Sequence, residues 1–100
     1  MSRDVRIDSS ASDELAAAVR WYEEQRPGLG RELLTAVDAA IELIGQQPYI
    51  GTAAYPDPQR RRAVVQRFPY QLVYQIADAE IVVVAIAHLK RRPGYWKHRG

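Results

Sequence analysis

The feature that most constrains the fold is a continuous apolar run, Ile81 to Ala87, near the end of the chain. Side chains alternate between the two faces of a strand, so a strand built from this run presents apolar side chains on both faces. Such a strand belongs in the interior of a sheet, with helices covering at least one of its faces. The sequence therefore predicts an interior strand over residues 81–88.

Three more segments have the composition or the alternation of strands. Residues 62–66 and 70–76 are rich in Val, Ile and Tyr, and short connections separate them from each other and from the apolar run. We expect them to form an antiparallel meander with that run. Polar and apolar residues alternate over residues 4–8, which indicates a short first strand.

Two helices are expected between the first strand and the meander. The first starts at a hydroxyl N-cap within residues 10–13, where a carboxylate follows three positions after a serine, and it ends near Gln25. The second runs from about Gly30 to Ile44, and Gly45 is its expected stop. Residues 47–59 contain three prolines and a glycine and are expected to form a loop.

Together these elements predict one domain over residues 1–100 with the order β-α-α-β-β-β. The expected class is α+β, a helical hairpin packed on a small, twisted, mainly antiparallel sheet. On the first helix, Trp21 and Tyr22 lie at helical spacing with other apolar residues, so packing in the core is favoured for both. Glu23 and Glu24 are interpreted as solvent-exposed charges at the end of that helix.

Charge is distributed unevenly along the chain. Residues 1–59 hold 5 Lys or Arg and 10 Asp or Glu, a net charge of −5, whereas residues 60–100 hold 9 Lys or Arg and 2 Asp or Glu, a net charge of +7. The basic part is therefore expected to meet an anionic partner, either nucleic acid or an acidic protein segment. The alternative is a solvated sheet edge whose positive charges discourage aggregation.

Composition also excludes several classes of protein. The absence of cysteine excludes disulfides and a Cys nucleophile. The N-terminus lacks the apolar core of a signal peptide and the longest apolar run is too short to cross a bilayer, so we expect a cytoplasmic protein that is not in a membrane. Because there is no Gly-rich phosphate loop and no cysteine to complete a zinc site with the two histidines, no metal or nucleotide cofactor is expected.

Candidate binding residues lie on either side of the meander. Cations gather around its first and last strands: Arg60, Arg61, Arg62 and Arg67, then Lys90, Arg91, Arg92, Lys97 and Arg99. Alternation places Arg60 and Arg62 on one face of an extended segment and Arg61 on the other, so these three cannot all serve one site.

Three further residues near the C-terminus are candidates for function. His88 ends the apolar strand and is able to act as a general acid or base near neutral pH; a structural role is the alternative. Tyr95 and Trp96 adjoin several cations, which suits stacking on bases or docking on a protein partner. For these two aromatic residues, capping the core is the alternative.

Several segments, taken in order, resemble ParE-type toxins of the RelE/ParE superfamily, which are also described as plasmid stabilisation proteins. They are Trp21-Tyr22-Glu23, Pro27-Gly28-Leu29-Gly30, Arg67-Phe68-Pro69-Tyr70 with Val73-Tyr74, and Ala85-Ile86-Ala87-His88 leading to Arg91-Arg92-Pro93-Gly94-Tyr95-Trp96. The resemblance implies a toxin that a cognate antitoxin neutralises by wrapping it with a helix and an extended segment. A basic, strand-rich surface beside a helical hairpin suits an acidic partner of that kind.

The resemblance leaves two kinds of target open, because the superfamily contains toxins that cut mRNA on the ribosome and ParE toxins that poison DNA gyrase. Metal-independent RNA cleavage needs a base, an acid and cations around the phosphate. The candidates for these roles are Arg62, Arg67, His88 and Tyr95, but residues 81–87 contain no arginine, whereas RelE-like nucleases generally carry one on the last strand.

That departure favours a toxin that acts by binding gyrase or another protein target. The expected contact residues for target or partner are Arg60, Arg61, Arg62, Arg67, Arg91, Arg92, Tyr95 and Trp96. A ribosome-dependent mRNA endonuclease and a non-toxic protein-interaction module remain the alternatives.

Overall fold

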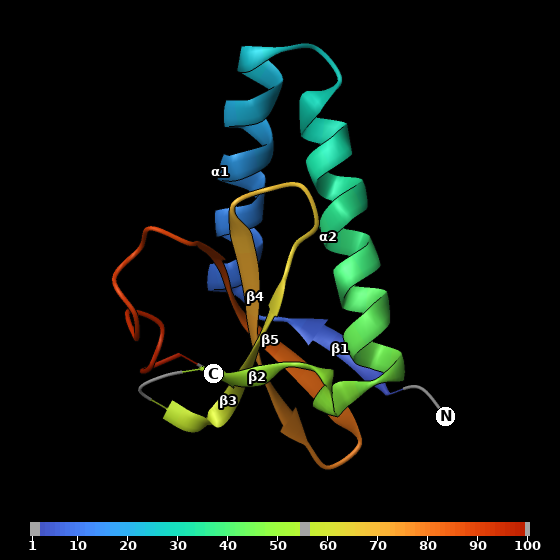
Figure 1. Cartoon of the computed structure of the whole chain (residues 1–100), viewed down its shortest axis with the longest axis vertical. Coiled ribbons are helices and arrows are strands. Elements are labelled where there is room, and N and C mark those ends of the chain that lie inside the picture. Colours follow the sequence, from blue (N-terminus) through green and yellow to red (C-terminus); the bar gives the residue numbers. More distant parts are fainter. Residues whose placement is uncertain (1–2, 55–56, 100) are drawn as a thin grey trace.

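A hairpin of two helices packs against a five-stranded mixed sheet (Figure 1). The computed structural model describes residues 3–54 and 57–99. The elements, in chain order, are β1 (Asp4–Ile7), α1 (Ser9–Gln25), α2 (Leu29–Gln46), the 3-10 helix η1 (Pro48–Ile50), β2 (Thr52–Ala54), β3 (Asp57–Val64), β4 (Tyr70–Ala77) and β5 (Glu80–His88). The predicted α+β class, with its helical hairpin on a mainly antiparallel sheet, is confirmed.

The strands follow the order β1-β5-β4-β3-β2, so the apolar run forms an interior strand, as predicted. β5 pairs with β1 in parallel and with β4 in antiparallel, and β4 and β3 continue the expected meander. The helices cover one face, where Leu33, Val37 and Ile44 of α2 share a core with Leu72 and Val83 of the sheet.

The opposite face of the sheet is covered by the end of the chain. We call residues 89–99 the C-terminal segment; in Figure 1 it loops out beside the lower half of α1. The segment contains neither helix nor strand, yet its Trp96 is only 3% exposed and packs on Val82, Val84 and Ala85. The two apolar faces of β5 are therefore covered by different parts of the chain: the helices on one side and the C-terminal segment on the other.

A β-bulge interrupts β5 at Val84. Val73 pairs with Ala85 and Tyr74 pairs with Val83, so Val84 is an extra residue without a partner on β4. Val84 and Ala85 both belong to the core beneath the C-terminal segment, whereas Ile86 returns to the core beneath the helices. The bulge thus shifts the alternation of the strand by one residue.

The expected loop over residues 47–59 was wrong for most of its length. It contains η1 and the edge strand β2, and β3 begins at Asp57 instead of residue 62; residues 55 and 56 lie outside the described part of the chain. Thr52 pairs with Arg62 and Ala53 with Arg61, and the register then shifts before Ala54. Proline is compatible with edge strands and bulges, so the prolines did not exclude strands here.

Two predicted helix boundaries also differ from the structure. The amide of Asp8 bonds to the carbonyl of Val83, so the chain turns directly from β1 into α1, which starts at Ser9 and has no side-chain cap. Gly45 does not end α2, which continues to Gln46. Gly45 is buried within the helix, next to the start of β1, and its carbonyl oxygen accepts a hydrogen bond from the Arg3 amide at 2.9 Å.

The connection between the helices depends on two glycines. Gly28 adopts a left-handed conformation with φ of 92°, which favours glycine. Gly30 lies so close to α1 that an added Cβ would be 2.7 Å from the carbonyl oxygen of Val19. The carboxylate of Glu23, expected to be only a solvated charge, accepts hydrogen bonds from the amides of both glycines, at 2.9 and 3.0 Å.

Trp21 is 56% exposed, so the expectation that it packs in the core was wrong, whereas Tyr22 is partly buried against the core. The hydrophobic stripe of α1 runs through Ala11, Ala18 and Tyr22, and Trp21 lies at its margin with its ring edge-on to Tyr22. No helix in the described residues is long and apolar enough to span a bilayer.

The close approach of the helices at Gly30 predicts an asymmetric response to alanine. Gly30→Ala should lower the free energy of unfolding by about 1–3 kcal/mol, because backbone atoms of α1 must move. Gly45→Ala in the same helix is the control, since its Cβ would meet Arg3 and Val5 at 3.4 Å, an ordinary contact. Urea denaturation of both variants checks this, and equal stabilities would contradict the packing described.

Candidate functional site

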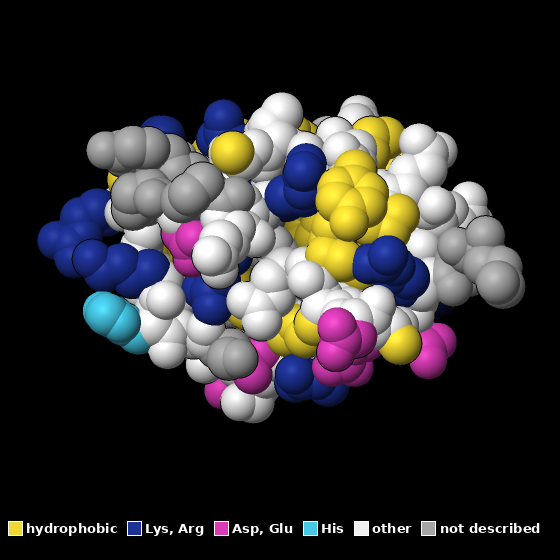
Figure 2. Space-filling view, turned by 90° about the horizontal axis from the view of Figure 1, so that it is seen from below, with side chains coloured by type: hydrophobic (Ala, Val, Ile, Leu, Met, Phe, Trp, Pro, Cys, Tyr) yellow, Lys and Arg dark blue, Asp and Glu magenta, His cyan; other side chains and the backbone are white. Residues whose placement is uncertain are grey.

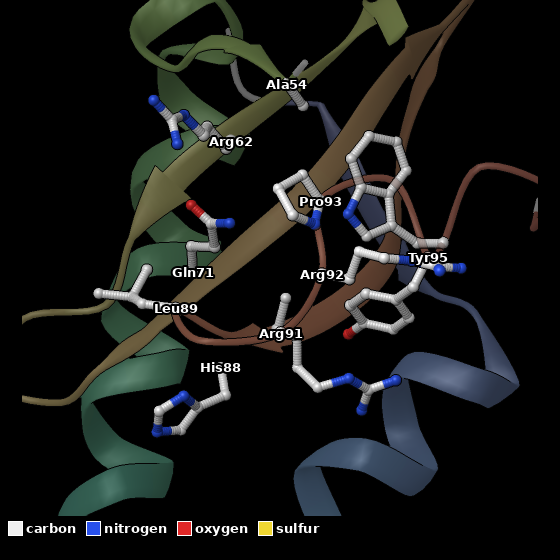
Figure 3. A pocket seen from close by; sticks show the side chains of 11 residues that line it. Ala54, Arg62, Gln71, His88, Leu89, Arg91, Arg92, Pro93 and Tyr95 are labelled. Carbon is white, nitrogen blue, oxygen red and sulfur yellow. The ribbon is translucent and has the colours of Figure 1, made fainter. Parts of the chain in front are cut away.

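A cavity of about 180 Å³ lies between the sheet and the C-terminal segment (Figure 3). Six of the residues singled out from the sequence line it: Arg62, His88, Arg91, Arg92, Tyr95 and Trp96. They come from β3, the end of β5 and the C-terminal segment, which the fold brings together. Arg60, Arg61 and Arg67 do not line this cavity.

The three consecutive arginines of β3 divide between the faces of the sheet, as alternation predicts. Arg60 and Arg62 lie on the face of the C-terminal segment. Arg61 donates to the carbonyl oxygen of Gly51 at 2.7 Å, and its guanidinium lies 5.0 Å from the ring centroid of Tyr49. Only Arg62 of the three contributes to the cavity.

Arg60 is 7% exposed and holds the C-terminal segment to the sheet. Its guanidinium donates to the carbonyl oxygen of Trp96 at 2.8 Å and to that of Arg99, and its Nε donates to Gln75 at 3.1 Å. The same guanidinium lies 5.6 Å from the centroid of the Trp96 ring. The hydrogen-bonding groups of this buried guanidinium are therefore engaged within the chain itself, chiefly by backbone carbonyl oxygens.

Arg67 lies in the turn between β3 and β4, with a φ of 72°. Its guanidinium donates to Glu32 of α2 at 3.1 Å, and Arg26 donates to the other oxygen of the same carboxylate at 2.7 Å. The hydrogen bond from Arg26 is the main cause that lowers the pKa of Glu32, and Arg67 adds to it. Arg67 therefore pairs with the helical hairpin.

His88 lies at the rim of the cavity, at the end of β5. Its Nδ1 accepts a hydrogen bond from the amide of Lys90 at 3.0 Å, so in the neutral ring the proton is on Nε2. The ring packs edge-on against Tyr70, with centroids 5.1 Å apart. It also lines a surface hollow together with Trp21 and Tyr22.

Tyr95 is held at both its hydroxyl and its ring. The hydroxyl donates to Oε2 of Glu14 at 2.7 Å, and the guanidinium of Arg91 lies 3.9 Å from the ring centroid. Burial raises the pKa of Tyr95 above its ordinary value, and the hydrogen bond and charge of Glu14 raise it further. At neutral pH the phenol is therefore a fixed hydrogen-bond donor.

Glu14 of α1 connects three parts of the chain. Besides Tyr95, its carboxylate accepts the amide of Ile86 at 3.1 Å, just after the bulge in β5, and Nη1 of Arg99 at 2.8 Å. Arg99 also donates to the carbonyl oxygen of Val84 at 3.2 Å. The C-terminal segment is thus fixed by Glu14 on one side and by Arg60 on the other.

A second, more apolar groove of about 390 Å³ adjoins the cavity. It lies between α2, η1 and β3, and its exposed apolar side chains are Leu43, Ile50, Val64 and Leu89. The cavity and the groove share Arg62, Gln71 and Leu89, so they lie side by side. The face seen from below in Figure 2 carries an apolar patch with Lys or Arg side chains on both sides.

Within residues 3–54 and 57–99, no three His, Cys, Asp or Glu side chains come together in a way that could hold a metal ion. The polar and aromatic groups that line the cavity are instead guanidinium, imidazole, phenol and indole side chains with one amide. These groups suit contact with anionic or aromatic surfaces.

Comparison with known proteins gives the family. Residues 5–93 match the family model described as the ParE toxin of the type II toxin-antitoxin system parDE. The chain belongs to the ParE toxin family. Among solved structures, a chain of the chromosomal ParDE TA system from P. aeruginosa is similar in fold, with a TM-score of 0.77 at 15% identity, over 87% of this chain and 96% of that one. No curated protein matches.

For this ParE-family chain, sequence reasoning missed Glu14, which organises the site. A signal was present, because Glu14 is three residues after Ala11 and four before Ala18, and both alanines are buried. A carboxylate on the buried stripe of a helix needs a partner. The sequence did not indicate that the partners are Tyr95, Arg99 and an amide of β5.

The role of Arg60 predicts that lysine cannot replace it. Arg60→Lys should lower the free energy of unfolding by about 2 kcal/mol, because one ammonium cannot reach Gln75 and both carbonyl oxygens of the C-terminal segment. Arg62→Lys, two residues away on the same face but exposed, should change it by less than about 0.5 kcal/mol. Chemical denaturation measures both, and a stable Arg60→Lys variant would contradict the clamp.

The raised pKa of Tyr95 predicts a loss of stability in alkali. Above about pH 10 the unfolded chain releases the phenol proton while the folded chain retains it, so the stabilisation present below that pH declines as the pH rises. Tyr95→Phe should make this decline shallower, whereas Tyr49→Phe, at an exposed ring, should not. Urea denaturation between about pH 8 and 11 tests this; identical slopes for both variants would show that burial and Glu14 do not raise the pKa of Tyr95.

Proposed function

We propose that this ParE-family chain is a toxin that arrests growth by binding a protein target, DNA gyrase, and that a cognate antitoxin neutralises it. The observation that carries the mode of action is the state of the two acid–base candidates. Nδ1 of His88 already accepts the Lys90 amide, and the Tyr95 hydroxyl donates to Glu14. Neither group is a free base for the 2′-hydroxyl proton of RNA.

The charge arrangement supports the same proposal. Of the cations that a nuclease would require, Arg62 lines the cavity but Arg67 is paired with Glu32 on the helical hairpin. Arg91 and Arg92 are exposed on the C-terminal segment beside Tyr95. Exposed cations around aromatic rings suit recognition of a protein surface more than stabilisation of one phosphorane.

One observation favours the alternative of ribosome-dependent mRNA cleavage. Arg62, His88 and Tyr95 line a single cavity, so three of the four nuclease candidates are close together. In that reaction the imidazolium form of His88, protonated at both ring nitrogens and released from the Lys90 amide, would serve as the acid for the leaving oxygen, and a group of the ribosome would have to supply the base.

For the antitoxin we propose a segment with apolar and acidic residues that occupies the groove between α2, η1 and β3. Leu43, Ile50 and Val64 would accept its apolar side chains, and Arg62 at the junction of the two hollows would pair with a carboxylate. β3 continues two residues beyond its last pairing with β2 at Arg62, so an extended segment can add to its edge. Such a segment would lie beside the cavity and contact it at Arg62, without reaching Arg91.

Induction of the chain alone in a bacterial host, with pulse labelling of DNA and protein synthesis, tests the target. We expect DNA synthesis to fall first, with DNA breaks and an SOS response, and His88→Gln to retain full toxicity. An early fall in protein synthesis that His88→Gln abolishes would establish the nuclease alternative. Normal growth at verified expression would identify a non-toxic interaction module.

Two leucines of α2 with nearly equal exposure test the antitoxin site. Leu43, 41% exposed, lines the groove, whereas Leu34, 40% exposed, lies outside it. Leu43→Asp should weaken binding of the antitoxin encoded beside the gene by about tenfold or more, because a carboxylate must be buried against apolar side chains. Leu34→Asp should leave the affinity unchanged; titration calorimetry measures both, and equal effects would place the antitoxin elsewhere.

A further inference from the structure

One exposed cation of the site, Arg91, lies on a ring that is itself fixed. Arg91 is an exposed residue of the C-terminal segment, and its guanidinium is 3.9 Å from the centroid of the Tyr95 ring. Figure 3 shows Arg91 extending past that ring toward α1. Arg91 lines both the cavity and the neighbouring hollow that contains Trp21 and His88.

The position of the Tyr95 ring is set from α1, by Glu14. Oε2 of Glu14 accepts the Tyr95 hydroxyl at 2.7 Å, while Oε1 accepts the amide of Ile86 at 3.1 Å and Nη1 of Arg99 at 2.8 Å. The Ile86 amide belongs to an interior strand, so the carboxylate has a rigid reference point. The connection therefore runs from β5 through Glu14 and Tyr95 to Arg91.

We propose that Glu14 is a positioning residue for target recognition: through Tyr95 it holds the Arg91 guanidinium in place to meet an anionic surface of the target protein. The inference rests on the proposed function, because it concerns how that binding surface is preorganised. A long, flexible cation loses rotamer freedom when it binds, and a side chain already ordered on a ring loses less.

The test is the concentration of the full chain that half-inhibits DNA supercoiling by gyrase. Glu14→Gln should raise it about tenfold, because the neutral amide holds the phenol and Arg99 less firmly. Arg91→Ala should raise it at least as much, and the double variant should be no weaker than Arg91→Ala alone. Glu24→Gln, at an exposed carboxylate of the same helix, is the control and should leave the concentration unchanged.

Antitoxin affinity separates positioning from a general loss of structure. The antitoxin should bind Glu14→Gln as tightly as the unmodified chain, since the proposed groove does not contain Glu14. The positioning role is overturned if Glu14→Gln weakens antitoxin binding as much as gyrase inhibition. It is also overturned if the effect of Glu14→Gln on gyrase inhibition adds fully to that of Arg91→Ala.

A second readout does not depend on gyrase. NMR relaxation of the Arg91 side-chain Nε–H should show a restricted guanidinium in the unmodified chain, and a mobile one in Glu14→Gln and in Tyr95→Phe. If the chain fails to inhibit gyrase but Arg91 is restricted in this way, the proposed target is wrong and the positioning role stands. If Arg91 is equally mobile in all three proteins, the positioning role is wrong.

Discussion

The rest of the structure depends on the hydrogen bonds that the carboxylate of Glu14 accepts. β1 stops pairing with β5 at Ile7 and Val83, and the chain turns away into α1. Beyond that point no strand within the described residues pairs with this edge of β5, and a buried amide without an acceptor destabilises the fold. Glu14 supplies the acceptor for Ile86, and with its remaining capacity it holds Tyr95 and Arg99. One side chain of the first helix thus completes the central strand and attaches the end of the chain to it.

This arrangement gives the two faces of the sheet different roles. The helical hairpin covers one face with a core of α2 and sheet residues, whereas the other is covered by eleven residues without helix or strand, held by Trp96, Arg60 and Glu14. Burial of Trp96 leaves the neighbouring cations of the segment at the surface. Because the apolar groove adjoins the cationic cavity at Arg62, a partner bound in the groove would lie beside the surface that we propose for the target.

Sequence patterns predicted those parts of the molecule that follow from local periodicity. The apolar run over residues 81–87 identified the interior strand, and alternation separated Arg61 from Arg60 and Arg62. Periodicity could not predict the bulge at Val84, because both faces of β5 are apolar and a shift by one residue leaves the pattern unchanged. It also could not identify Arg60 as a buried clamp or Glu14 as its counterpart, since their partners in β5 and the C-terminal segment are 36 or more residues away along the chain. Long-range polar contacts of this kind depend on the packed fold.

Native-state hydrogen exchange tests the central claim most directly. If Glu14 unites β5 with the C-terminal segment, Glu14→Ala should accelerate exchange at the amides of Ile86, Lys97 and Arg99 together. The amide of Leu72, on the far side of β5 in strand β4, should keep its protection. Acceleration at Ile86 alone, with Lys97 and Arg99 unchanged, would show that the C-terminal segment is held without Glu14 and would contradict the account.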